Sequence, residues 1–175
     1  MSNYKINLHK IKAFAFDVDG VFTDGSLLVD NDGHFLRIYN AKDGYAVRQA
    51  ILKDYKIVII TGGLAASIEH RFKNLGVEDV FLGSEDKIHD FNDFCNRYNI
   101  QADEVLCMGD DIPDIEMMNV AGISACPADA VNEVKDAANY ISSFNGGKGC
   151  VRDVIEQVLK VQGKWNANAD KVKSE

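Results

Sequence analysis

Two carboxylates, Asp17 and Asp19, stand two residues apart directly after the apolar run Ile11–Phe16. Such a run is typical of a buried strand, and open α/β sheets bind their ligands at the C-terminal ends of strands. Carboxylates at this point favour Mg²⁺-assisted attack by one of them on a phosphate. That chemistry requires further groups, which must hold the phosphate and complete the metal site.

Three later apolar runs are each followed by residues that can serve the same chemistry. Thr61 and Gly62 form a small-residue turn, whose hydroxyl and backbone N–H groups can hold phosphate oxygens. Lys87 is a compact positive charge suited to a phosphate, and Asp110 is a further carboxylate that can join Asp17 in binding a hard cation. Each motif alone is typical of an ordinary turn or helix cap. Together and in this order, they indicate a phosphate-binding edge of a parallel sheet.

The elements that must position these residues are short apolar runs alternating with amphipathic segments, which is typical of a parallel sheet with crossover helices. We expect strands at 11–16, 56–60, 79–82, 104–108, 122–125 and 139–142, and helices at 45–54, 65–75, 88–98, 112–119, 131–137 and 150–161. The sequence thus predicts an α/β fold, a doubly wound, Rossmann-like parallel sheet flanked by helices. We expect one domain over residues 1–165, followed by a polar, disordered tail over 166–175.

Residues 24–40 interrupt this alternation directly after the acidic motif. Two segments rich in apolar residues flank Asn31-Asp32-Gly33, a strong turn signal. The pattern predicts a β-hairpin inserted after the first strand.

The chain resembles the haloacid dehalogenase superfamily of phosphotransferases in four motifs: Asp17-Val18-Asp19-Gly20-Val21, Thr61, Lys87 and Gly109-Asp110-Asp111. The resemblance implies that Asp17 is the nucleophile and forms an aspartyl-phosphate. It implies that Asp19 is the general acid and base. Thr61 and Lys87 would hold the phosphoryl group, assisted by the backbone at Gly62.

The same resemblance implies a Mg²⁺ ion, bound by the carboxylate of Asp17, the backbone carbonyl of Asp19 and the carboxylate of Asp110. Asp111 would support either the metal-bound waters or Lys87. Asp114 lies one turn further on, and the sequence leaves open which of these two aspartates has that role.

Larger members of the superfamily carry a cap domain, for which the intervals between these motifs leave no room. An uncovered site would be open to water and would select a small substrate poorly. Capless relatives with such a hairpin are tetramers, so the resemblance implies a homotetramer in which apolar hairpin residues lie between subunits. The alternative is a hairpin that folds onto its own domain.

Residues 17–25, 39–45 and 146–152 resemble a subgroup of capless phosphatases that act on sugar-acid phosphates. The resemblance favours an eight-carbon octulosonate phosphate, in lipopolysaccharide precursor synthesis, over a nine-carbon sialic-type acid phosphate. Many of these relatives have basic residues after Thr-Gly, whereas this chain has Gly63. A contact to the substrate carboxylate is therefore expected to be missing or replaced. Lys148 is a candidate substrate ligand in a glycine-rich segment, and the alternative is a charged residue in a flexible turn.

The composition limits the remaining possibilities. A formal net charge of −8 over 175 residues argues against nucleic acid as a partner. We expect no membrane association and a cytoplasmic location, because no apolar run is long enough to span a bilayer and the N-terminus lacks a signal-peptide pattern. The cysteines are widely spaced and are expected to be buried free thiols: Cys95, Cys107, Cys126 and Cys150.

Three alternatives to a phosphatase are weaker. A receiver domain of two-component signalling places its lysine after the phosphorylated aspartate and the threonine, whereas Lys87 here precedes Asp110. A non-catalytic scaffold is disfavoured because every expected catalytic position carries the expected residue type. A phosphomutase usually has a cap to retain its intermediate.

Overall fold

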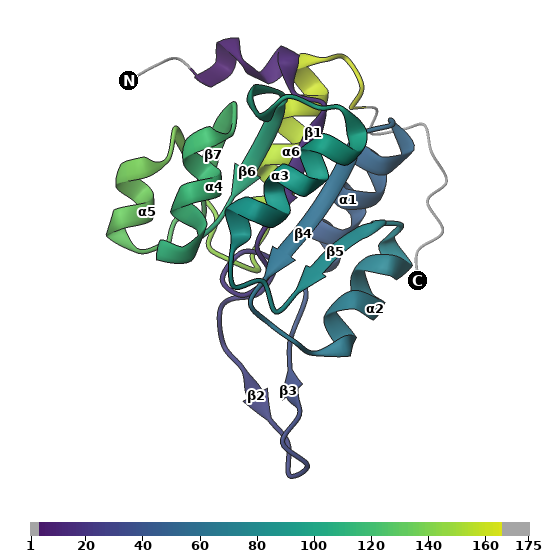
Figure 1. Cartoon of the computed structure of the whole chain (residues 1–175), viewed down its shortest axis with the longest axis vertical. Coiled ribbons are helices and arrows are strands. Elements are labelled where there is room, and N and C mark those ends of the chain that lie inside the picture. Colours follow the sequence, from purple (N-terminus) through teal and green to yellow (C-terminus); the bar gives the residue numbers. More distant parts are fainter. Residues whose placement is uncertain (1–3, 166–175) are drawn as a thin grey trace.

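The computed structural model describes residues 4–165, so the expected disordered tail at 166–175 lies outside the described residues. Six parallel strands form one sheet in the order β5-β4-β1-β6-β7-β8 (Figure 1). These strands are β1 (Ala13–Phe16), β4 (Lys56–Thr61), β5 (Asp79–Leu82), β6 (Val105–Met108), β7 (Ile123–Cys126) and β8 (Tyr140–Ile141). β1 lies inside the sheet and pairs with β4 on one side and β6 on the other.

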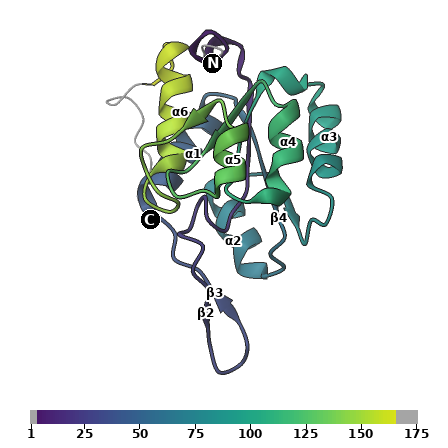
Figure 2. The ribbon, with the colours of Figure 1, turned by 90° about the vertical axis from the view of Figure 1, so that its left-hand side faces the viewer.

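Helices cover both faces of the sheet (Figures 1 and 2). One group packs with the core around Phe14 and Phe16: α1 (Ala41–Leu52), α2 (Ala66–Leu75) and α6 (Cys150–Val161). The other packs with the core around Ala13 and Ala15: α3 (Lys87–Tyr98), α4 (Ile115–Val120) and α5 (Asn132–Ala137). Successive residues of a strand point to opposite faces, so β1 supplies both cores and is buried throughout. The predicted doubly wound fold is confirmed.

Two predicted helices differ from the structure by more than one residue. α1 begins at Ala41 rather than Tyr45, because the Asn40 side chain caps it by accepting the backbone N–H of Lys42. Gly44 within the first turn weakens the helical signal there. The predicted helix 112–119 is divided into a 3₁₀ turn, η4 (Ile112–Asp114), and α4. The other 3₁₀ turns are η1 (Tyr4–Ile6), η2 (Leu8–Lys10) and η3 (Ala102–Glu104).

The predicted hairpin is present and forms a separate two-stranded sheet of β2 (Leu28–Val29) and β3 (Phe35–Leu36). Asp30 closes its turn by accepting backbone N–H groups from Asp32 and His34. The hairpin stands clear of the domain beyond the sheet (Figures 1 and 2). Its apolar side chains are exposed, Leu28 by 65% and Ile38 by 87%. The alternative in which the hairpin folds onto its own domain is therefore wrong.

The cysteine expectation is confirmed, because all four cysteines are buried and free of disulfides. Within residues 4–165, no helix combines the length and the apolar character that crossing a bilayer requires.

Candidate active site

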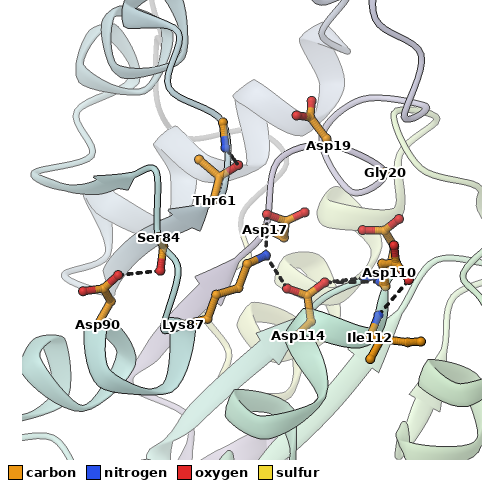
Figure 3. A network of polar contacts seen from close by, with 12 residues as sticks. Asp17, Asp19, Gly20, Thr61, Ser84, Lys87, Asp90, Asp110, Ile112 and Asp114 are labelled. Carbon is orange, nitrogen blue, oxygen red and sulfur yellow. Dashed lines mark hydrogen bonds and ion pairs between the residues drawn. The ribbon is translucent and has the colours of Figure 1, made fainter.

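The candidate site lies where the direction of winding in the sheet reverses. The chain runs from β1 outward through β4 to β5, and then continues on the other side of β1 with β6, β7 and β8. In open α/β sheets, ligands bind in the crevice outside the strand ends at such a reversal. Asp17 directly follows β1, Thr61 ends β4 and Asp110 comes two residues after β6. The topology therefore brings these predicted residues together (Figure 3).

Lys87 joins two buried carboxylates at the centre of the site (Figure 3). Its Nζ donates to Asp17 Oδ1 at 3.0 Å and to Asp114 Oδ1 at 2.6 Å. Asp17 is only 6% exposed and Asp114 only 1%. The lysine is the first residue of α3, whose N-cap is Asp86. A cation is thereby fixed beside the expected nucleophile.

Asp114 rather than Asp111 is the carboxylate that supports Lys87. The second oxygen of Asp114 accepts the backbone N–H groups of Asp110 and Asp111, at 3.0 and 3.3 Å. The exposed Asp111 instead accepts the backbone N–H of Ile112. The alternative in which Asp111 supports Lys87 is therefore corrected, because the Asp111 side chain turns outward to cap η4. The spacing of one turn between Asp110 and Asp114 is the sequence signal for this arrangement.

Two glycines let the carboxylates approach the backbone. Gly20 has φ +89°, and a Cβ at this residue would overlap the carboxylate of Asp110. A Cβ at Gly109 would overlap the side chain of Asp114. These close approaches explain why glycine follows Asp19 and precedes Asp110.

The charges of this site fit a divalent cation. One oxygen from each of Asp17, Asp110 and Asp114 lies within 4.8 Å of the others. Burial, and then repulsion by Asp114, raises the pKa of Asp17 despite the opposing effect of Lys87. Burial, and then repulsion by Asp17 and Asp114, raises the pKa of Asp110 to about 8. The single positive charge of Lys87 does not balance the negative charges of Asp17, Asp110 and Asp114. A hard divalent cation, which prefers oxygen ligands, would balance them.

Lys87 remains a cation in this setting. Burial opposes its charged form, but the carboxylates of Asp17 and Asp114 outweigh that effect and raise its pKa. The site therefore combines the permanent positive charge of Lys87 with more carboxylates than that one charge can neutralise.

Asp19 is held apart from Asp17 by an arginine of the hairpin. Arg37 Nε donates to Asp19 Oδ1 at 2.7 Å and Arg37 Nη2 to Asp19 Oδ2 at 2.8 Å. The Asp19 carboxylate points away from that of Asp17 (Figure 3). The sequence pattern did not indicate Arg37, although a single cation within the apolar segment 35–38 is a signal that could have found it.

Thr61 and Lys148, two further predicted site residues, lie in different surroundings. Thr61 is buried, and its Oγ1 accepts the backbone N–H of Gly63 at 3.2 Å (Figure 3). Lys148 is exposed and lies 3.6 Å from Asp24, outside the Asp17 cluster. Its glycine-rich segment nevertheless contacts the loop after Asp17, where Gly147 N donates to Val21 O.

Asp43 connects two of the stretches that carried the subgroup resemblance. Its Oδ1 accepts the backbone N–H of Arg152 at 2.7 Å, at the N-terminus of α6. Nearby, Asn40 Nδ2 donates to Gly147 O. Asp43 is fully buried, and its Oδ2 has no hydrogen-bond partner within the described residues. Burial raises the pKa of Asp43 to about 6, although the N–H groups of α6 oppose the shift.

We expect Asp43→Asn to change how stability depends on pH. A folded-state pKa of about 6, raised from 3.8, means that wild type loses stability as pH rises from 4 through 6, by roughly 3 kcal/mol at most. Asparagine stays neutral and can still accept the Arg152 N–H, so the variant should not show that loss. Urea unfolding from pH 4 to 7.5 measures the difference. Parallel stability curves would show that Asp43 does not titrate in this range.

Comparisons with known proteins agree with this geometry. The family model for haloacid dehalogenase-like hydrolases matches residues 79–155. The 3-deoxy-D-manno-octulosonate 8-phosphate phosphatase KdsC of Escherichia coli K12 is 36% identical over 154 residues, which are 88% of this chain and 82% of that protein. The chain belongs to the KdsC family of haloacid dehalogenase-like hydrolases. The receiver-domain alternative is thereby excluded.

Solved structures support the same KdsC assignment. The phosphatase of that name from Yersinia pestis superposes with a TM-score of 0.91 at 32% identity, covering 93% of this chain and 88% of that one. The Moraxella catarrhalis phosphatase, solved with a magnesium ion, a phosphate ion and KDO, has a TM-score of 0.89 at 28% identity, covering 93% and 94%. Membership of the KdsC family makes the chain a hydrolase of phosphoric monoesters.

Proposed function

We propose that the protein hydrolyses 3-deoxy-D-manno-octulosonate 8-phosphate (KDO 8-phosphate) to KDO and phosphate, in lipopolysaccharide precursor synthesis. The observation that carries the chemistry is the buried Asp17, held by Lys87 at the reversal point of the sheet. The choice of substrate rests on the KdsC relatives, one of which was solved with KDO itself.

In this proposal, Asp17 attacks the phosphorus atom, and the bond from phosphorus to the sugar oxygen breaks. The carboxylate becomes an aspartyl-phosphate, and Asp19 protonates the departing oxygen. Asp19 then takes a proton from the water that hydrolyses the intermediate. Lys87 offsets the negative charge of the transferring group, together with Thr61 and the backbone at Gly62. Asp19 must turn toward the leaving oxygen, because its carboxylate points away from Asp17 (Figure 3).

The cofactor in this proposal is Mg²⁺, held by the carboxylates of Asp17 and Asp110 and the backbone carbonyl of Asp19. A bound Mg²⁺ neutralises charge on the phosphate oxygens and orients the group for attack. The oxygen-only donor set and the raised pKa values of Asp17 and Asp110 support this choice.

Kinetics on a panel of phosphate esters test the proposed substrate. With Mg²⁺, kcat/KM should be higher for KDO 8-phosphate than for a nine-carbon sialic-type acid 9-phosphate and for glucose 6-phosphate. A clear preference for the nine-carbon acid would overturn the substrate assignment but not the reaction. Absence of hydrolysis of every ester would favour the non-catalytic scaffold.

We also propose a cytoplasmic homotetramer. The four buried cysteines are all unpaired, which is typical of a reducing compartment. The hairpin stands free with exposed apolar side chains, which a neighbouring subunit would cover. In this proposal, the glycine-rich turn that carries Lys148 would extend toward the site of a neighbouring subunit.

Light scattering should therefore give the mass of four copies at micromolar concentration. Leu28→Asp places a charge in the exposed hairpin and should yield smaller species without loss of helical signal. Leu52→Asp, at an exposed leucine of α1, is the matched control and should remain tetrameric. A wild-type monomer would contradict the proposed homotetramer.

A further inference from the structure

A cavity beside the candidate active site lies between the hairpin and the turn after β4. Its volume is about 740 Å³, and its lining includes Asp19, Arg37, Gly63 and Leu64. A larger hollow of about 1070 Å³ lies near the starts of β1, β4 and β6, where it is lined by none of the predicted site residues. The cavity beside Asp19 therefore has the position that the non-phosphate part of a substrate requires.

The cavity is poor in positive charge. Of the described residues that line it, Arg37 is the only lysine or arginine. Leucine, alanine, glycine and phenylalanine make up most of the rest. For an anionic group that enters this cavity, Arg37 is thus the one permanently charged cation among the described lining residues.

The hydrogen bonds of Arg37 do not use every N–H of its guanidinium, in a side chain that is only 4% exposed. Nε and Nη2 donate to Asp19, and Nη1 donates to the backbone oxygen of Phe35 at 3.1 Å. A guanidinium has five N–H donors, so one N–H on each terminal nitrogen is not used by these contacts. The parallel Nε and Nη2 edge already binds both oxygens of Asp19, so the donors that remain for a second anion are the unused N–H groups of Nη1 and Nη2.

Arg37 also lies next to the position at which this chain has glycine after Thr61-Gly62. A Cβ built on Gly63 would come within 3.1 Å of Arg37 Nη2 and 2.8 Å of Ile68 Cδ1. The arginine therefore occupies space into which a longer side chain at residue 63 would extend. Because residue 63 has no side chain, the hairpin arginine can reach the end of β4.

We propose that Arg37 is the residue that recognises the carboxylate of the substrate, through the N–H groups that Asp19 and Phe35 leave unused. Arg37 thereby connects the acid end of the substrate with Asp19. Arg37, which belongs to the hairpin, would thus take the place of the basic side chain that many relatives have where this chain has Gly63. This inference rests on the proposed function, because it names the group that distinguishes a sugar-acid phosphate from a neutral sugar phosphate.

The test compares kcat/KM for KDO 8-phosphate with that for glucose 6-phosphate, which has no carboxylate. Both are alkyl phosphates, so a change that affects only Asp19 should cancel in their ratio. Arg37→Met should lower the ratio about 10- to 100-fold, mainly through KM for the acid substrate. Arg37→Lys should retain part of the selectivity, since it keeps the charge but loses the two-pronged geometry.

A double variant tests the spatial relation to Gly63. Arg37→Met with Gly63→Arg should recover selectivity for the acid, because removal of the guanidinium leaves only Ile68 Cδ1, the end of a flexible side chain, to move away from the new Cβ. Arg48→Met removes an arginine of α1 that does not line the cavity, and should leave the ratio unchanged. Equal losses on both substrates in Arg37→Met would overturn the proposal and leave Arg37 only with the task of positioning Asp19.

The two proposals fail separately. If wild type does not hydrolyse KDO 8-phosphate, the proposed substrate is wrong. The effect of Arg37 is then measured as the ratio of kcat/KM for 6-phosphogluconate to kcat/KM for glucose 6-phosphate, because only the first of these has a carboxylate. An unchanged ratio in Arg37→Met would overturn the role of Arg37 whichever acid is hydrolysed.

Discussion

Asp17→Asn should abolish phosphate release, with a loss of kcat on the order of 10⁴-fold or more, the scale for removing a covalent nucleophile. The amide cannot form an aspartyl-phosphate, although it occupies the same volume. Lys87 keeps its ion pair with Asp114 in the variant, and the repulsion between Asp17 and Asp114 disappears. We therefore expect the fold to survive. Release of inorganic phosphate and thermal unfolding by circular dichroism measure the two effects.

The matched control for this variant is Asp93→Asn. Asp93 is an exposed aspartate of α3, so the control makes the same change of charge on the surface. Its activity should stay within about twofold of wild type, as surface substitutions are usually neutral. Retained turnover in Asp17→Asn would remove Asp17 from the role of nucleophile.

Removal of divalent cations should stop the reaction, and Mg²⁺ should restore it. Asp110→Asn should raise the Mg²⁺ concentration for half-maximal activity by about 10- to 100-fold or more, the range found for disturbed metal sites. Mg²⁺ at about 100 times its dissociation constant should also stabilise wild type by about 2.7 kcal/mol. Titrations of activity and of melting temperature with Mg²⁺ after EDTA treatment measure both effects.

Asp136→Asn, at an exposed aspartate of α5, controls for the general loss of negative charge. It should show the same Mg²⁺ dependence as wild type. Activity that is indifferent to EDTA would disprove the metal assignment. A melting temperature that Mg²⁺ raises equally in Asp110→Asn would place the ion elsewhere on the molecule.

The strands and the main site motif could be predicted from the sequence because their signals are local. Apolar runs mark the strands, and the turn that follows each run carries the chemistry. In a parallel sheet the C-terminal ends of neighbouring strands meet at one edge, so order along the chain was enough to bring Asp17, Thr61 and Asp110 together. Lys87 at the start of α3 followed from the same logic.

The remaining contacts depend on how distant elements pack, which periodicity does not encode. The contact between Arg37 and Asp19 depends on the direction in which the hairpin leaves the domain. The hydrogen bond from Arg152 to Asp43 joins residues 109 positions apart, on two helices of the same face. Lys148 carries a charge whose partner in this chain, Asp24, no local pattern specifies.

The inner position of β1 also has a consequence for synthesis of the chain. β4, one partner of β1, is complete at Thr61, but the other partner, β6, begins only at Val105. Until β6 has been made, one side of β1 lacks its neighbour, and unpaired strand edges favour aggregation of nascent chains. Asp110 and Asp114 follow β6, so a truncated chain that ends before β6 has neither carboxylate. Enzymatic activity therefore indicates that β6 has been made and that both sides of β1 are paired.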